Sequence, residues 1–493
     1  LAGWNGFGVV VQAYGPRAAF VIDWLYALAK KHDRRIMVRL VKGAYWDTEI
    51  KRAQTLGLAG YPVFTRKTNT DVSYMACAKK LLSMTDRIYP QFATHNAHTI
   101  AAVHHLAKGR PYEYQRLHGM GTDLYAEVIG AQNLNVPCRV YAPVGTHEDL
   151  LPYLVRRLLE NGANTSFVNR VVDESLPVRE LVADPCETVR SFASIPHPRI
   201  PLPVNLYGEL RKNSMGVNFS NDNELKALAE TVNAKSGPWT AAPLVPGATS
   251  AGPTVQVTNP ADRRQVVGSY VSADSATVEK ALANAVAAQH GWDRLPAASR
   301  AAILEHAAEQ LEARRGEFIA LCVREAGKGL PDAIAEIREA ADFLRYYATM
   351  ARRYFGQPEQ LPGPTGESNQ LFLNGRGVFV CISPWNFPLA IFLGQVAAAL
   401  AAGNSVIAKP AEQTNLTAHF AVKLLHEVGV PADVLQLLPG DGAKIGPLLT
   451  SDPRVSGVVF TGSTDVAWAI NRSLAARPAA LAPLIAETGG QNA

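Results

Sequence analysis

Two separate series of alternating strand-like and helix-like segments dominate this sequence, and they restrict the fold to the α/β class. In the first series, short β-rich runs alternate with amphipathic stretches from residue 7 to about residue 162. Such alternation predicts parallel strands joined by crossover helices. The strand candidates are residues 7–13, 36–42, 62–66, 88–94, 112–117 and 139–143, and the helix candidates are 17–32, 47–56, 71–84, 97–108, 123–132 and 147–161. These six βα units fit either most of an eight-fold barrel or a doubly wound sheet, and periodicity alone does not decide.

The second series of strands and helices is preceded by a predicted hairpin and a long helical region. A β-hairpin with an Asn-Pro turn is predicted at residues 255–268, and a long helical region at 276–354, where Ala, Leu and Glu recur at helical spacing. Strand candidates then lie at 377–383, 405–410, 434–439, 455–462 and 483–488, with helix candidates at 389–402, 415–428, 442–450 and 464–476. This order is typical of a doubly wound, Rossmann-like nucleotide-binding domain.

A proline-dense stretch separates the two series. The segments SIPHPRIPLPVNLYG (194–208) and AAPLVPG (241–247) predict an extended connector. Because 493 residues are too many for one hydrophobic core, several domains are expected. We therefore predict a first α/β domain at 1–174, a linker at 175–254 and a nucleotide-binding domain at 255–493.

The composition excludes several classes of protein. Hydrophobic residues make up 47% and charged residues 18%, which is ordinary for a globular protein, and the net charge of +5 does not require a nucleic-acid partner. The five cysteines show no CxxC spacing, so neither a disulfide framework nor a metal site is expected, and a reducing cytoplasm fits. The longest apolar stretch, residues 389–402, is too short to span a bilayer.

Polar motifs follow the strands of the second series, where ligands bind in open parallel sheets. SPWNFP (383–388) follows the first strand, and the Asn386 amide could donate to an oxyanion or cap the next helix. In KPAEQT (409–414), Lys409 and Glu412 could hold a ribose diol or form a surface ion pair. FTGST (460–464) opens a helix, where Gly462 and Ser463 favour a pyrophosphate. In ETGG (487–490), Glu487 is a candidate general base.

In this order and spacing, the four motifs resemble those of the aldehyde dehydrogenase superfamily. The resemblance covers residues 255–493 and implies that Asn386 forms part of an oxyanion hole and that Glu487 activates the hydrolytic water. It implies that Lys409 and Glu412 bind the adenosine ribose of NAD, that Ser463 binds the pyrophosphate, and that the cofactor cleft is shaped by Pro384, Trp385, Gly440, Gly462 and Gly489. A carboxylate at Glu412 would repel the 2′-phosphate of NADP.

One feature departs from that family. Its nucleophilic cysteine lies beyond the ETGG motif, and none of the five cysteines here can replace it; Cys381 lies within a predicted core strand. The chain begins at Leu1, just before a strand, and ends after ETGGQNA. We therefore expect an internal fragment that does not oxidise aldehydes.

The first series also gathers polar residues at its strand ends. Arg39 and Lys42 lie on an otherwise apolar strand, and a buried charge must be paired or face a ligand. Lys67 and Thr68 follow the next strand candidate, and His95 follows another, where it could equally cap a helix or lie in the core. In the last helix, Tyr153, Arg156, Arg157 and Glu160 share one face, which could clamp a carboxylate or form a solvated salt-bridged surface.

The strings MVRLVKGAYWDTEIKRAQ, FTRKTNTD, THNAHT and YLVRRLLENGAN resemble the proline dehydrogenase barrel. This resemblance implies that residues 1–174 form a partial (β/α)8 barrel, with about six of its eight βα units. Together with the second series, the order of these strings resembles the bifunctional proline utilization A family. This resemblance implies an FAD site, with Arg39 near the flavin N5, formed by Gln12, Arg39, Lys67, Thr68, His95 and Glu160. It implies that Arg156 and Arg157 hold the carboxylate of proline, in a pocket walled by Leu40, Tyr45, Tyr141 and Tyr153.

The implied function is the two-step oxidation of L-proline to glutamate, through pyrroline-5-carboxylate and glutamate semialdehyde, with FAD and NAD as cofactors. The resemblance also implies a quinone electron acceptor, a homo-oligomer, and a cytoplasmic protein that can associate with the inner face of the bacterial membrane. One alternative is a monofunctional aldehyde dehydrogenase fused to a non-catalytic barrel. Another is a proline-responsive DNA-binding repressor, although the sequence contains no ribbon-helix-helix segment and no basic stripe.

Overall fold

The computed structural model describes residues 4–162, 182–235, 237–249 and 251–489, together with residues 177 and 179. For residues 156–162 it describes the backbone only. The chain divides into two compact units. Unit 1 comprises residues 1–55 and 60–202, and unit 2 comprises residues 56–59 and 203–493.

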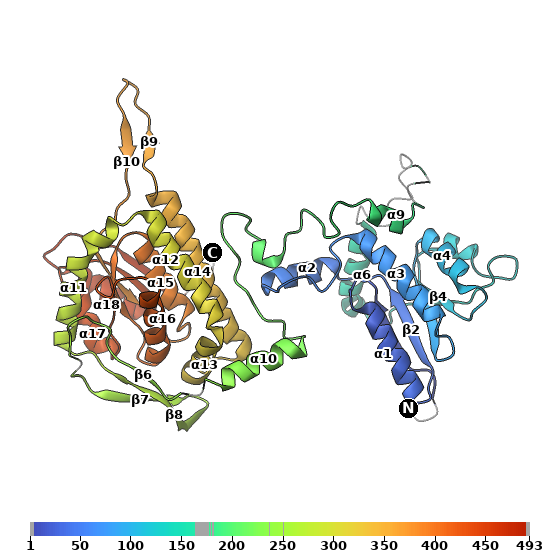
Figure 1. Cartoon of the computed structure of the whole chain (residues 1–493), viewed down its shortest axis with the longest axis horizontal. Helices are drawn as coiled ribbons and strands as arrows, with labels where there is room; N and C mark the ends of the chain where they lie inside the picture. The colour runs from blue at the N-terminus through green and yellow to red at the C-terminus, as the bar shows by residue number, and fades with distance from the viewer. Residues whose placement is uncertain are drawn as a thin grey trace. The chain divides into compact units, whose positions relative to one another are not determined.

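Unit 1 is built on a parallel sheet of five strands in the order β1-β2-β3-β4-β5 (Figure 1). The strands are β1 (Gly8–Gln12), β2 (Ile36–Val41), β3 (Ile88–Ala93), β4 (Glu113–Leu117) and β5 (Cys138–Tyr141). Sequential neighbours in one parallel sheet are what a segment of a (β/α)8 barrel requires. The prediction of a strand at 62–66 is wrong, because these residues form a loop before α3.

Helices cover one face of this sheet. They are α1 (Ala18–Lys31), α3 (Lys67–Leu82) and α4 (Ala97–Ala107), and their apolar faces form one core with alternate residues of the strands. The other helices of unit 1 are α2 (Trp46–Thr55), α5 (Thr122–Ala126), α6 (His147–Gly162) and α9 (Pro185–Arg190). Helix α4 begins at Ala97 because the side chain of Asn96 accepts a hydrogen bond from the Thr99 amide.

Unit 2 contains a second parallel sheet, in the order β13-β12-β11-β14-β15. Its strands are β11 (Val378–Ile382), β12 (Ser405–Lys409), β13 (Leu435–Leu437), β14 (Val455–Gly462) and β15 (Leu484–Thr488). The intervening helices are α15 (Ala390–Ala401), α16 (Asn415–Glu427), α17 (Gly442–Thr450) and α18 (Thr464–Ala475). The strand order reverses direction between β11 and β14, which confirms the predicted doubly wound fold.

The predicted helical region forms four helices, α11 (Ser275–Asp293), α12 (Ala297–Ala313), α13 (Arg315–Ala326) and α14 (Leu330–Phe355). Helices α12, α14 and α15 pack side by side (Figure 1), and their alanine and leucine side chains supply much of the largest core cluster. A hairpin of β9 (Glu359–Leu361) and β10 (Asn369–Leu371) projects from this body (Figure 1).

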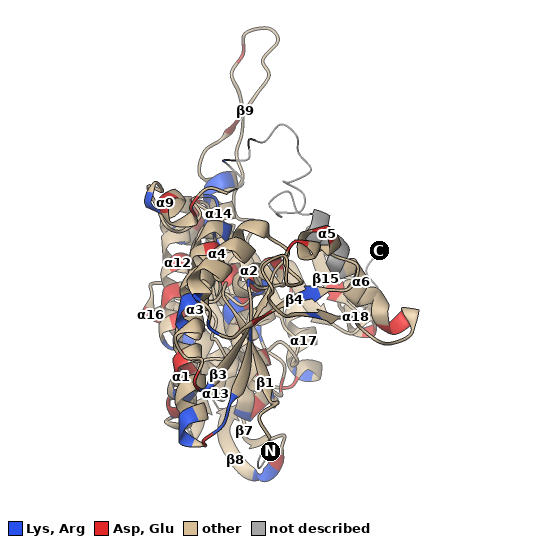
Figure 2. Ribbon diagram, turned by 90° about the vertical axis from the view of Figure 1, so that its right-hand side faces the viewer, with Lys and Arg blue, Asp and Glu red and all other residues tan. Residues whose placement is uncertain are grey.

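Part of the segment that was predicted as an extended connector is regular structure. Helix α10 (Asp222–Asn233) and strand β6 (Trp239–Ala241) belong to unit 2, and β6 pairs with β8 (Asp262–Val271). Strand β8 also pairs with β7 (Thr254–Asn259), which confirms the predicted hairpin. Among the described residues, no helix is long and apolar enough to cross a membrane. In Figure 2, ribbon segments that carry Lys and Arg are interspersed with segments that carry Asp and Glu.

Candidate active sites

A buried polar network occupies the face of the unit 1 sheet that the helices leave uncovered. Gln91 on β3 and Glu113 and Gln115 on β4 are all less than 10% exposed. The Glu113 carboxylate accepts hydrogen bonds from Gln91 Nε2 (2.8 Å) and Gln115 Nε2 (2.9 Å) and pairs with Arg139 Nε at 2.8 Å. Burial alone would raise the pKa of Glu113, but the hydrogen bonds from Arg139, Gln115 and Gln91 hold it below its usual value.

Arg39 on β2 joins this network. Its Nε donates to Gln115 Oε1 at 2.8 Å, and its guanidinium lies 4.8 Å from the centre of the Tyr141 ring. Leu40, by contrast, is fully buried in the core beneath the helices. Successive side chains of a strand point to opposite faces, so the structure does not bring Leu40 together with Arg39.

A cluster of charges lies at the carboxyl end of β2. Lys42 Nζ is 2.5 Å from Asp71 Oδ1, and Lys67 Nζ is 3.3 Å from Asp71 Oδ2. Burial lowers the pKa of Lys42, and the Asp71 carboxylate counteracts part of that effect. Lys67 and Thr68 are the first two residues of α3, whose first turn has no side-chain cap from Arg66. A helix N-terminus with an adjacent lysine suits a phosphate group, so these residues fit the pyrophosphate of FAD.

The other predicted residues of unit 1 that the structure describes differ in burial. Gln12 is the exposed last residue of β1, Tyr45 is 46% exposed, and Tyr153 is half-buried in α6. His95 Nε2 accepts a hydrogen bond from the Leu117 amide at 3.2 Å, while the neighbouring Asn96 caps α4. The side chains of Arg156, Arg157 and Glu160 lie outside the described residues.

The segment before residue 202 also contacts the loop that carries Lys67, which the sequence did not reveal. Arg66 donates from Nη2 to Ser194 O (3.1 Å) and from Nε to Pro196 O (3.3 Å). Asn69 Nδ2 donates to Ile195 O at 3.2 Å, and the Arg66 guanidinium lies 4.1 Å from the centre of the Phe192 ring. Backbone carbonyl acceptors leave no signature in the sequence, and the prolines at 196–203 indicated only an extended connector.

In unit 2, strand register aligns the four predicted motifs at one edge of the sheet. Ile382 on β11 pairs with Lys409 on one side and with Phe460 on the other, and Phe460 pairs with Ala486. The motifs therefore begin at neighbouring carboxyl ends, and SPWNFP and FTGST flank the point where the strand order reverses.

Lys409 is buried at this edge, whereas Glu412 is exposed. Their charged atoms are 3.9 Å apart, and Lys409 Nζ donates to Pro410 O at 2.6 Å. Burial lowers the pKa of Lys409 to about 8, although Glu412 and Asp441 favour its charged form. Gly440, with φ of +136°, precedes α17; a Cβ there would lie 2.4 Å from Ser272 Oγ. A Cβ on Gly442, the first residue of α17, would lie 3.7 Å from both Lys409 Nζ and Glu412 Oε2, so the predicted ribose residues lie beside the start of this helix.

Asn386 does not cap the helix that follows it. The first turn of α15 is capped by Glu336 of α14, whose carboxylate accepts from the amides of Leu389 (3.2 Å) and Ala390 (2.9 Å). Glu336 is buried and pairs with Lys328 Nζ at 2.8 Å. Asn386 is exposed, as are Trp385 and Phe387, whereas Pro384 is half-buried. This leaves the Asn386 amide available for the predicted oxyanion role.

Ser463 and Glu487 occupy the other side of the reversal point. Ser463 is exposed and caps α18, accepting from the Val466 amide at 3.3 Å. Glu487 on β15 is exposed and pairs with Thr461 in the register. A Cβ on Gly462 would overlap the Phe460 ring at 2.5 Å, whereas a Cβ on Gly489 would meet no heavy atom of the described residues within 4 Å. Gly462 is thus required for packing, and Gly489 leaves open space.

Gln395 is a residue of this site that the sequence analysis missed. It is buried on α15, and its Nε2 donates to Thr461 Oγ1 (2.9 Å) and Ile382 O (3.3 Å). It therefore bridges the ends of β11 and β14 at the reversal point. A lone amide in the most apolar stretch of the chain was the signal that could have identified it.

Neither cysteine of unit 2 is accessible. Cys322 on α13 and Cys381 on β11 are both 0% exposed, and burial raises the pKa of both thiols. A thiolate is the reactive form of cysteine, so neither side chain has the environment of a nucleophile. The predicted core position of Cys381 is confirmed.

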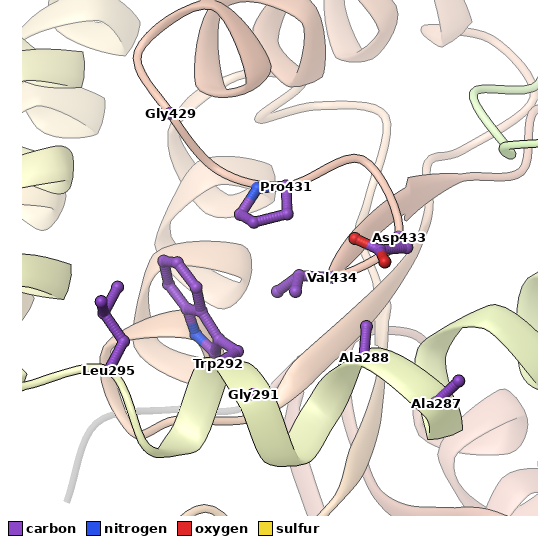
Figure 3. A pocket seen from close by; sticks show the side chains of 9 residues that line it. All are labelled: Ala287, Ala288, Gly291, Trp292, Leu295, Gly429, Pro431, Asp433 and Val434. Carbon is purple, nitrogen blue, oxygen red and sulfur yellow. The ribbon is translucent and has the colours of Figure 1, made fainter.

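A separate pocket of about 410 Å³ lies at the opposite edge of the unit 2 sheet (Figure 3). It is formed by the end of α11 and the loop before β13, and Trp292, Pro431, Asp433 and Val434 point toward it. In an open parallel sheet, ligands bind at the carboxyl edge. The four motifs lie at that edge, and this pocket does not.

Comparison with known proteins assigns both units. The family model for "Proline dehydrogenase" matches residues 1–170, and that for "Aldehyde dehydrogenase family" matches residues 248–493. The chain is 54% identical over 510 residues to the bifunctional protein PutA of Salmonella typhimurium, and the match covers 100% of the chain and 38% of that relative. The chain belongs to the PutA family. The PutA of Rhizobium meliloti is 53% identical, covering 100% of the chain and 40% of that relative.

Solved structures agree with this assignment. A crystal structure of a Bradyrhizobium japonicum PutA mutant matches 99% of the chain and 47% of its own chain, with 54% identity and a TM-score of 0.89. A PutA of Bdellovibrio bacteriovorus, described as inactivated by N-propargylglycine, matches 99% of the chain and 51% of its own chain, with 32% identity and a TM-score of 0.88. The chain therefore spans about two-fifths of the length of the curated PutA relatives.

Proposed function

We propose that this chain forms the FAD site and the NAD site of a PutA-type enzyme that oxidises L-proline to glutamate. In the first reaction, proline loses two electrons and two protons to give pyrroline-5-carboxylate. Hydrolysis of this imine gives glutamate semialdehyde, which is oxidised to glutamate in the second. The observation that carries the proposal is that two parallel sheets in one chain each have a polar cluster at the carboxyl end of their strands, in residues matched by these two families.

The flavin supplies an acceptor for the electrons that proline loses. Lys67, Thr68 and the N-terminus of α3 would hold its pyrophosphate, and Arg39, Gln12 and His95 would contact the rest of the cofactor. Tyr141 lies against Arg39 and would form a wall of the substrate pocket with Tyr45 and Tyr153. The family resemblance assigns Arg156 and Arg157 to the proline carboxylate and Glu160 to FAD. Two adjacent guanidinium groups suit a bidentate contact with a carboxylate.

In unit 2, Lys409 and Glu412 would hold the adenosine ribose of NAD, and Ser463 at the start of α18 would hold the pyrophosphate. Asn386 would donate to the oxyanion that develops on the aldehyde, and Glu487 would take a proton from the hydrolytic water. The family resemblance requires a cysteine thiolate that attacks the aldehyde, and Cys322 and Cys381 are both fully buried. The chain itself is therefore proposed to bind NAD without oxidising the aldehyde.

The remaining assignments rest on the resemblance alone. They are a quinone as electron acceptor, a homo-oligomer, and a cytoplasmic location with peripheral contact to the membrane.

Anaerobic addition of L-proline to the purified, FAD-loaded chain tests the flavin half. We expect the flavin absorbance to bleach with L-proline and not with D-proline. We also expect calorimetric titration to detect binding of NAD to the chain. Lys67→Ala should weaken FAD binding, and Lys79→Ala, a basic variant near the other end of α3, should not. Bound flavin that proline does not bleach would favour the non-catalytic barrel. Specific DNA binding in a gel shift would favour the repressor.

A further inference from the structure

Gln115 lies between the guanidinium of Arg39, which can only donate hydrogen bonds, and the carboxylate of Glu113, which accepts them. On one side, Arg39 Nε is 2.8 Å from Gln115 Oε1; on the other, Glu113 Oε1 is 2.9 Å from Gln115 Nε2. Gln115 is 6% exposed and Glu113 is 3% exposed. The three side chains therefore form a chain of hydrogen bonds that ends on the residue predicted to lie near the flavin.

The charges fix the orientation of the Gln115 amide. A guanidinium only donates hydrogen bonds, and an ionised carboxylate only accepts them. Glu113 is held ionised, because the hydrogen bonds from Arg139, Gln115 and Gln91 keep its pKa below the usual value despite its burial. The amide must therefore give its NH2 to Glu113 and its oxygen to Arg39. If the amide were reversed, its NH2 would face the donor Arg39 Nε and its oxygen would face the acceptor carboxylate of Glu113.

The carboxylate of Glu113 is itself held in place by further hydrogen bonds. Arg139 contacts it through Nε (2.8 Å) and Nη2 (3.0 Å), and Gln91 Nε2 donates to it at 2.8 Å. Arg39 is held a second time by the Tyr141 ring, 4.8 Å from its guanidinium. An arginine has several rotatable bonds, and ordering it before the ligand arrives removes an entropic cost from binding.

We propose that Gln115 is a positioning residue for the flavin site, which holds Arg39 Nε so that the terminal nitrogens of the guanidinium face the cofactor. The inference rests on the proposed binding of FAD by Arg39. Gln115 transmits the orientation of Glu113 to Arg39, and its own side chain does not contact the flavin.

Gln91 provides a matched control. Gln91 and Gln115 are both buried glutamines whose amides donate to the same oxygen of Glu113, but Gln115 alone of the two contacts Arg39. Methionine matches the length of glutamine and accepts hydrogen bonds only weakly. Both Gln115→Met and Gln91→Met therefore remove a hydrogen bond to Glu113, but only Gln115→Met also removes the acceptor for Arg39 Nε.

The first test measures the dissociation constant of FAD and the flavin midpoint potential in the full chain. A hydrogen bond to a charged group typically corresponds to about 10- to 100-fold in an equilibrium constant. We expect Gln115→Met to weaken FAD binding by about 10-fold or more and to lower the potential, because the positive charge is less well placed. Gln91→Met should change both much less. In an Arg39→Met background, Gln115→Met should have almost no further effect on affinity, because no guanidinium remains to be positioned.

The second test does not depend on the flavin. Crystal structures of the two FAD-free variants should show Arg39 in a changed or multiple conformation in Gln115→Met, and unchanged in Gln91→Met. The inference is overturned if Arg39 keeps its conformation in Gln115→Met, or if the two variants weaken FAD binding equally. If the wild-type chain does not bind FAD, the proposed function fails, while the conformation of Arg39 still decides whether Gln115 positions it.

Discussion

Lys409, a proposed NAD-binding residue, is buried in a way that reduces the stability of unit 2. Its side chain is 2% exposed, and burial lowers its pKa from 10.5 to about 8. Since each pKa unit corresponds to about 1.4 kcal/mol, keeping the charge in the folded state costs on the order of 3 kcal/mol. A residue retained at such a cost is a candidate for ligand binding.

We predict that Lys409→Met stabilises unit 2 at pH 7 by about 1–3 kcal/mol and weakens NAD binding at least 10-fold. The unfolded state binds the proton more tightly, so the penalty is fully present below about pH 8. It is relieved between about pH 8 and 10.5, and the stability advantage of the variant should shrink over that range. Urea unfolding and calorimetric titration with NAD measure the two effects. Lys423→Met on the exposed side of α16 is the control, and a variant less stable than wild type would contradict the prediction.

At the level of single residues, the sequence located charged side chains on buried strands better than it predicted their contacts. The polar ends of buried strands identified Arg39, Lys42 and Lys409, because a charge in an apolar run needs a partner. The family resemblance placed Leu40 in the substrate pocket, whereas the structure buries this residue in the core beneath the helices. Gln115 was missed because the role of a neutral amide on a short strand depends on hydrogen-bond partners that the sequence does not show. The signal of Gln395, a lone amide in an apolar stretch, was not used.

Two buried glutamates act at the level of whole elements, since each caps a helix that follows a cofactor motif. Glu336 caps α15 after SPWNFP. Glu325 of α13 caps α16 after KPAEQT, accepting from the amides of Leu416 and Thr417, both at 2.7 Å. A carboxylate at a helix N-terminus satisfies unpaired amides and favours the helix dipole. The long helices of unit 2 thereby hold the two loops that bear the proposed NAD and oxyanion residues.

Glu325 should make the stability of unit 2 depend on pH. Burial raises its pKa from 4.5 to about 7, against the opposing effect of its hydrogen bonds with Thr417 and Leu416. The folded state therefore binds a proton more tightly than the unfolded state. The contribution of this group falls as pH rises from about 4.5 to 7. We expect Glu325→Gln to remove that slope, measured as urea midpoints of unit 2 at several pH values. Equal slopes in both proteins would contradict this.

The strap formed by residues 192–197 offers an element-scale test in unit 1. Arg66→Ala removes two hydrogen bonds to the backbone carbonyls of Ser194 and Pro196 and the contact with Phe192. We expect faster deuterium uptake in residues 192–197 and several-fold weaker FAD binding, because Lys67 follows Arg66 directly. Loss of two such bonds corresponds to roughly 1–3 kcal/mol.

Arg190→Ala is the matched control, because this exposed arginine of α9 pairs with Glu187 and not with the loop. Unchanged deuterium uptake in Arg66→Ala would show that the strap is held in another way.

The elements themselves were largely predictable. Hydrophobic periodicity and turn residues located every strand of the unit 2 sheet, because strands of a buried parallel sheet are nearly continuous apolar runs. The error at 62–66 has a physical cause: PVFTR has the composition of a strand, but its backbone forms the loop that presents Lys67. Helix α10 and strand β6 were both missed, because the proline-dense segments on either side predicted an extended connector. Strand β6 is also short, and its pairing with the distant β8 depends on contacts far along the chain.

At the scale of the molecule, the two units should differ in catalytic competence. Unit 1 carries the proposed FAD-binding residues, whereas both thiols of unit 2 are fully buried with raised pKa values. The chain supplied with L-proline and a quinone should therefore accumulate pyrroline-5-carboxylate, detected by trapping with 2-aminobenzaldehyde. It should form no NADH from glutamate semialdehyde, even with NAD bound.

The accessibility of the cysteines provides the decisive control for that prediction. Alkylation requires an accessible thiolate, so brief treatment of the native chain with iodoacetamide should modify half-buried Cys138 and Cys186 before fully buried Cys322 and Cys381. Mass spectrometry of the digested protein measures the order. Formation of NADH that disappears as Cys322 or Cys381 becomes alkylated would show that unit 2 opens to expose a nucleophile, and would overturn the assignment of this half as a cofactor-binding unit alone.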